Sequence, residues 1–190
     1  EARLEAELKN AGSILFGTDI TANKADPFVQ QLMLTQQNLF TARRASFEAE
    51  VSALEQSIQA LKDQLWGVDQ SLTNRLVQIQ LQEKHLKSIK TLAEEGYAPK
   101  NQVLQMEQTQ TELKTALSDL KSNQARLSRS IEESQFRMAQ RKQDYLKDAM
   151  GQLAEVKKEV QAGKERLTAT NEELARTQIK SPVEGQVVGM

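Results

Sequence analysis

The sequence predicts an all-α protein: a long antiparallel α-helical hairpin of coiled-coil type, with a short extra N-terminal helix and, at its end, the start of a β lipoyl-like half-motif. Three observations support this fold class. Apolar residues recur in steps of three and four along most of the 190-residue chain, which places them on one helix face. Aromatic residues make up only 4%, as in coiled coils with a narrow core. Gly96 and Pro99 interrupt the pattern once, near its middle.

Residues 1–12 are predicted to form the short helix, and residues 13–26 an irregular loop. Leu4 and Leu8 share one helix face, and Gly12 suits the C′ position that closes a helix. The stretch "SILFGTDITANKA" mixes β-branched and turn residues without helical spacing. This loop either makes a contact of its own or packs back on the helices. Asp26 as N-cap and Pro27 at the first helical position then begin the next helix.

Residues 27–178 are predicted to form the hairpin, with one arm at 27–93, a tip at 94–99 and a second arm at 100–178. The apolar ladder of the first arm contains two consecutive steps of four, which predict a stutter at Val68, Leu72 and Leu76. In the second arm, polar residues occupy seam positions, where they weaken packing and can fix the register. These residues are Gln110, Gln124 and Ser134.

The break between the arms is either a flexible joint or a sharp turn. Arms of about 66 and 79 residues measure roughly 100 and 120 Å, and each has one apolar stripe that needs a partner. Folding back buries both stripes at low loop-closure cost, so we predict a turn with Gly96 in the left-handed conformation and Pro99 at the first position of the second arm. Facing residue numbers should add up to about 193, which places Leu65 near Leu127. The short helix is expected to cover the overhanging base of the second arm.

The composition argues against several functions. The formal charge of −1 gives no long-range attraction to nucleic acid or anionic lipid. Cysteine is absent, and the single histidine, His85, has no second histidine with which to share a metal, so we interpret it as a surface residue. No group of residues suggests catalysis. We therefore expect neither an enzyme nor a bound cofactor or metal.

The final stretch, "RTQIKSPVEGQVVGM", predicts a strand–turn–strand rather than more helix. Pro182 disfavours a helical Ser181, and Gly185 interrupts a β-branched run. The chain begins within a helical pattern and stops abruptly here. No apolar run approaches the roughly 18 residues of a membrane span. We therefore expect a segment of a longer protein, with any membrane anchor outside it.

This combination resembles the periplasmic adaptors, or membrane fusion proteins, of the hemolysin D family. In that family the hairpin is inserted between two halves of a lipoyl-like domain, and the second half opens with Thr-x-Ile-x-Ser/Ala-Pro-x-x-Gly-x-Val. The stretch from residue 179 to 190 would begin that half, and Lys180 is not a lipoylation candidate. "RLEAEL" followed by a loop is similar to the adaptors of type I secretion systems. The matching motif positions are Thr177, Ile179, Ser181, Pro182, Gly185 and Val187.

The resemblance implies the function of a bridge in the periplasm. Such adaptors are anchored in the inner membrane of Gram-negative bacteria beside an ABC transporter, form a homo-oligomeric ring, commonly a hexamer, and dock the hairpin tip on a TolC-like outer-membrane channel. The implied membrane contact comes only from segments outside this chain, and no nucleic acid is involved. The alternative for the tip is a solvated turn. The implied docking residues are Leu92, Glu94, Glu95, Gly96, Tyr97, Pro99 and Lys100.

Other interpretations remain at this point. Drug-efflux adaptors carry the tip motif Arg-x3-Leu-x6-Ser, which this chain matches only at Leu92. One alternative is a generic structural coiled-coil arm, which would not explain the β motif. Another is a membrane-bending helical module, which needs a basic face and is disfavoured by the near-zero net charge. Trp66–Gly67 is either a hinge or a place where Trp66 packs at the seam edge or against another subunit. The six basic residues against two Glu in 121–142 either contact an acidic surface or are solvated.

Overall fold

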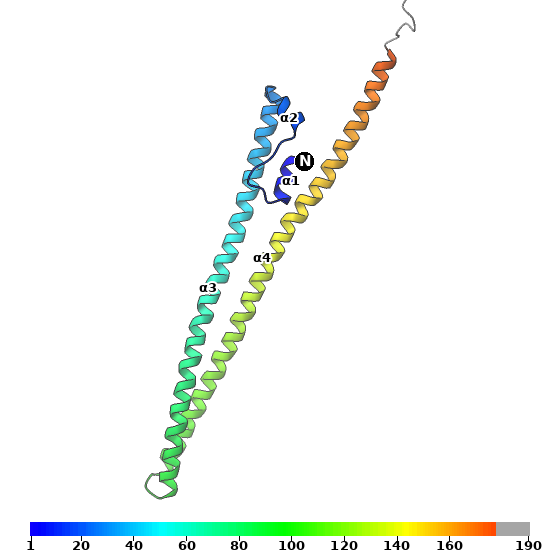
Figure 1. The fold of residues 1–190 in the computed structure, drawn as a ribbon. Helices are drawn as coiled ribbons and strands as arrows, with labels where there is room; N and C mark the ends of the chain where they lie inside the picture. The colour runs from blue at the N-terminus through cyan, green and yellow to red at the C-terminus, as the bar shows by residue number, and fades with distance from the viewer. Residues whose placement is uncertain (178–190) are drawn as a thin grey trace, which may run out of the picture. The chain divides into compact units, whose positions relative to one another are not determined.

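The computed structural model describes residues 1–177, which contain four helices (Figure 1). These are α1 (Ala2–Leu8), α2 (Thr18–Ala22), α3 (Pro27–Glu94) and α4 (Lys100–Thr177). The predicted all-α fold with a long helical hairpin is confirmed, whereas the predicted β segment from Ile179 lies outside the described residues. Within residues 1–177, no helix combines the length and the apolar character that crossing a membrane requires. The chain divides into two units, residues 1–45 with 144 onward, and residues 46–143.

In the unit of residues 46–143, α3 and α4 pack antiparallel along an apolar seam. Two hydrogen bonds across the seam establish the register. Gln110 Nε2 donates to Glu83 Oε1 at 3.1 Å, and Gln124 Nε2 donates to Asp69 Oδ1 at 2.7 Å. The residue numbers of both pairs add up to 193, as predicted. The buried apolar residues of the seam are Ile58, Leu72, Ile79, Leu86, Leu113 and Ile131.

The predicted stutter in the first arm is wrong. Leu76 is 46% exposed, whereas Arg75 is half-buried between the buried residues Leu72 and Ile79. The seam therefore keeps its alternating steps of three and four by accepting an arginine. The aliphatic stem of an arginine can lie along an apolar surface while its charged end stays near water. The Arg75 guanidinium donates to Gln78 on its own helix, at 2.9 Å.

The outer surface of this unit narrows two of the open interpretations. α3 runs unbroken through Gly67, and Trp66 is 68% exposed, so neither an interruption of the helix nor packing at the seam edge is present. Part of the basic charge in 121–142 is paired, because Arg137 binds Glu133 and Arg141 binds Glu50. His85 is exposed, and the described part of the chain holds no cluster of three or more residues suited to a metal.

In the other unit, α1 bridges the two arms (Figure 1). Arg3 donates to Gln36 of α3 at 3.0 Å and to Gln152 of α4 at 3.3 Å. The expectation that this helix covers the overhanging base of α4 is wrong, because residues 161–177 are exposed throughout. Ala6 of α1 packs with Ile14 and Phe40. The buried apolar residues of this unit are Leu4, Ala6, Ile14, Phe40 and Ala149.

A buried carboxylate holds this bridge together. The Glu7 side chain is 0% exposed and lies 2.5 Å from Arg3 and 3.3 Å from Arg43. Arg43 Nη2 also donates to Asp148 Oδ2 at 2.5 Å, and this hydrogen bond holds the pKa of Asp148 below its ordinary value. Burial, reinforced by the charge of Glu7, raises the pKa of Tyr145, whose ring lies 5.9 Å from the Arg43 guanidinium. A connected series of ion pairs, from Arg3 through Glu7 and Arg43 to Asp148, thus joins α1, α3 and α4.

The ends of α1 and the following loop differ from prediction. α1 ends at Leu8, and Asn10, with φ of 49°, takes the left-handed position that was assigned to Gly12. The Ala11 amide donates to the Ala6 carbonyl at 2.9 Å, which completes a Schellman motif. Residues 13–26 are not wholly irregular, because they contain α2. Ile14 and Phe16 pack back on the core.

The predicted start of α3 is confirmed. Pro27 is its first residue, and Asp26 Oδ1 accepts a hydrogen bond from the Phe28 amide at 2.8 Å. This bond satisfies one of the amide groups that the first turn of a helix leaves without a partner.

Candidate functional site at the hairpin tip

A tight turn joins the two long helices. Gly96 has a φ of 86°, so the predicted left-handed conformation is confirmed. The Tyr97 amide donates to the Leu92 carbonyl at 2.8 Å, and the Gly96 amide to the Ala93 carbonyl at 3.2 Å. This Schellman motif satisfies two carbonyl groups at the end of α3. Pro99 lies one position earlier than predicted, immediately before the first residue of α4.

Gly96→Ala is expected to lower the free energy of unfolding by about 1 kcal/mol, because alanine is strained at a positive φ. Gly67→Ala, within α3, is the matched control and should raise it by about 0.5–1 kcal/mol through better helix propensity. Neither added Cβ would meet an atom within 4 Å, so steric contacts do not enter the comparison. Urea unfolding followed by circular dichroism measures both. A destabilisation of equal size at both positions would contradict the assigned turn.

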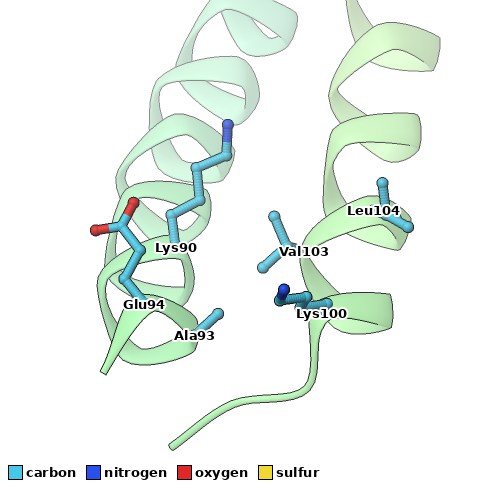
Figure 2. A pocket seen from close by; sticks show the side chains of 6 residues that line it. All are labelled: Lys90, Ala93, Glu94, Lys100, Val103 and Leu104. Atoms are coloured by element: carbon cyan, nitrogen blue, oxygen red, sulfur yellow. The ribbon is translucent and has the colours of Figure 1, made fainter. Parts of the chain in front are cut away.

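A groove of about 660 Å³ opens between the arms beside this turn (Figure 2). Figure 2 shows Ala93 of α3 and Val103 of α4 directed toward the space between the helices. Lys90 Nζ is paired with Glu107 Oε1 at 2.5 Å. The groove therefore has an apolar interior and a charged rim. Its lining residues are Lys90, Ala93, Glu94, Lys100, Val103 and Leu104.

Three apolar side chains are exposed in the turn and in the helix ends that it joins. Tyr97 is 81% exposed, Leu104 63% and Leu92 40%. Exposed aromatic and aliphatic groups beside polar ones are typical of surfaces that bind another protein. No nucleophile with an adjacent base lies here among the residues lining the groove, so the arrangement suits binding rather than bond chemistry.

The structure places the predicted site residues in two regions. Leu92 and Glu94 lie in the last turn of α3, the residues from Glu95 to Pro99 form the connection, and Lys100 begins α4. Thr177 is the last residue of α4. The other motif positions lie outside the described residues: Ile179, Ser181, Pro182, Gly185 and Val187.

Sequence reasoning missed most of the groove. It identified Glu94 and Lys100, but not Lys90, Ala93 or Leu104, as parts of the same surface. Leu104 carried a signal that could have been used, because it is an apolar residue immediately outside the seam that contains Val103.

Comparisons with known proteins agree with this architecture. Residues 1–173 match the family model described as AprE, long alpha-helical hairpin. The alkaline protease secretion protein AprE of Pseudomonas aeruginosa is 33% identical over 190 residues, which cover 100% of this chain and 44% of that protein. The proteases secretion protein PrtE of Dickeya chrysanthemi is 26% identical over 190 residues, which cover 100% of this chain and 42% of that protein.

A solved structure and a third relative extend the comparison. The soluble domain of LipC, a membrane fusion protein of a type I secretion system, matches with a TM-score of 0.90 and 29% identity, covering 97% of this chain and 86% of that one. The type I secretion system membrane fusion protein PrsE of Rhizobium meliloti is 23% identical over 186 residues, 98% of this chain and 42% of that protein. The chain spans less than half the length of the curated relatives that it matches.

Proposed function

We propose that this chain, because it belongs to the AprE family of long alpha-helical hairpins, is the helical part of a periplasmic adaptor in a type I protein secretion system. The names of the similar proteins support the system, since they describe protease secretion proteins and membrane fusion proteins rather than enzymes. They also favour protein secretion over drug efflux. In this proposal, the full protein is anchored in the inner membrane beside an ABC transporter and extends into the periplasm toward a TolC-like channel.

The arms suit a bridging function because each is one unbroken helix. α3 has 68 residues and α4 has 78, so they measure about 100 and 120 Å at 1.5 Å per residue. The proposed homo-oligomeric ring needs side chains outside the seam, and Trp66 and Phe136 are exposed there. No bond is made or broken in this function, and no cofactor is required.

The observation that carries the docking role is the exposed apolar surface of the tip. Tyr97 and Leu92 belong to a turn whose backbone is held by hydrogen bonds, so the surface is presented with little conformational freedom to lose on binding. A partner that covers these side chains gains apolar burial without unfolding the hairpin.

The test is the double substitution Leu92→Asp with Tyr97→Asp in the full-length protein, produced together with its transporter and channel. Secretion into the medium should be abolished, because two carboxylates would have to be buried against the channel. Helicity by circular dichroism should not change, since both side chains are exposed. The control is Thr73→Asp with Gln80→Asp, at two exposed positions of α3 away from the tip. Normal secretion by the tip variant would rule out docking through this surface.

A further inference from the structure

The charges at the tip are placed against the preference of the helix dipole. The last turn of α3 has no basic residue and ends in Glu94, followed by Glu95. The first turn of α4 has no acidic residue and begins with Lys100. Helix C-termini favour cations and N-termini favour anions, by about 0.3–1 kcal/mol for each charge. The stability of the hairpin itself therefore does not explain these three residues.

These charges also have no ion-pair partner among residues 1–177. Among residues 1–177, neither Glu94, Glu95 nor Lys100 takes part in an ion pair, whereas Lys90 on the same rim is paired with Glu107. Figure 2 shows the Glu94 carboxylate directed away from Lys100. Lys100 is thus the one unpaired cation among the described residues lining the groove.

We propose that the groove receives a helical turn of the outer-membrane channel in which an apolar side chain stands beside a carboxylate. This inference rests on the proposed adaptor function and specifies the partner's chemistry. The apolar side chain would pack on Ala93, Val103 and Leu104, and the carboxylate would pair with Lys100. Pro99, which precedes α4, has no side-chain acceptor for the first amide groups of the helix, so these amides add to the attraction for a carboxylate. A lysine at a helix N-terminus weakens the helix. Pairing with an acidic group of the partner would explain why Lys100 is nevertheless there.

The substitution Lys100→Glu separates a docking role from a structural one. A structural role predicts that the substitution lowers the stability of the hairpin, whereas a docking role predicts that it lowers only the affinity for the channel. It should preserve or slightly raise the stability of the hairpin, since an acidic residue suits a helix N-terminus. It should weaken binding of the full-length adaptor to the purified channel of the same system by about tenfold and reduce the salt dependence of binding. Lys121→Glu, an exposed position of α4 far from the groove, is the control.

A photo-crosslinking residue at position 104 supplies a second measurement. It should crosslink to the channel, and the crosslinked peptide should contain a carboxylate within one helical turn of the crosslinked residue. Unchanged affinity and salt dependence in Lys100→Glu, or a crosslink only to a second copy of the adaptor, would overturn the inference. If Leu92→Asp with Tyr97→Asp stops secretion while Lys100→Glu binds normally, the adaptor function stands and the groove proposal fails.

Discussion

Glu7→Ala is expected to detach α1 from the two arms at a cost of about 3 kcal/mol. The substitution leaves Arg3 and Arg43 without the carboxylate that both of them bind. Removing one member of a buried ion pair is costly because the remaining charge stays out of water without compensation. Arg43 keeps its pair with Asp148, but the largely buried Arg3 loses the one carboxylate that it binds among the described residues, and the Glu7 side chain itself is fully buried.

The detached helix should also melt. α1 has seven residues, far fewer than the 12–15 or so at which an isolated helix becomes even marginally stable in water. Its apolar anchor is small, since its packed cluster consists chiefly of Ala6, Ile14 and Phe40. The ionic contacts therefore decide whether α1 is folded, while the long helices keep their own seam.

Hydrogen exchange of the α1 amides measures this release directly. Exchange in residues 5–8 should rise by about 100-fold in Glu7→Ala, the equivalent of about 3 kcal/mol of lost protection. Glu5→Ala is the matched control, because Glu5 lies on the same helix in an exposed pair with Lys9 at 3.9 Å. Such surface pairs contribute about 0–1 kcal/mol. Equal exchange in the two variants would show that Glu7 does not hold the bridge.

The seam and the register could be predicted because both follow from local spacing. Apolar residues spaced three and four apart define one face of each helix. Because the connection between the two helices is short, the two apolar faces can meet in only a few registers. The prediction at Leu76 is wrong because it places only apolar residues in the seam of the first arm. The aliphatic part of the Arg75 side chain lies in the seam. The sequence does not indicate whether the aliphatic part of an arginine will be buried or the whole side chain will face water.

The bridge by α1 could not be predicted from spacing. Its contacts join residues far apart in the chain, such as Arg3 with Gln152 and Arg43 with Asp148. Charged residues are common in this sequence, and no local pattern distinguishes those that meet from those that face water. The left-handed Asn10 was missed for a simpler reason, because Gly12 nearby is the residue type that usually takes this conformation.

Ile79→Ala is expected to lower the free energy of unfolding by about 2–3 kcal/mol. Ile79 is 7% exposed and belongs to the seam that holds the two arms together below the tip. Removing a buried aliphatic side chain loses its transfer free energy and leaves a cavity. The lower part of the usual range applies, since a seam between two helices can partly close over the space.

Leu76→Ala separates the two descriptions of the seam. If the stutter were present, Leu76 would be a core residue, and its loss would cost about as much as that of Ile79. In the structure Arg75 takes that place, so Leu76→Ala should change the free energy of unfolding by no more than about 0.5 kcal/mol. The gain in helix propensity on changing to alanine differs between isoleucine and leucine by only a few tenths of a kcal/mol, so the difference measured by urea unfolding reports chiefly burial. If Leu76→Ala and Ile79→Ala lowered the free energy of unfolding by similar amounts, Leu76 would be a seam residue and the stutter would be present. A different set of α4 residues would then face this part of α3.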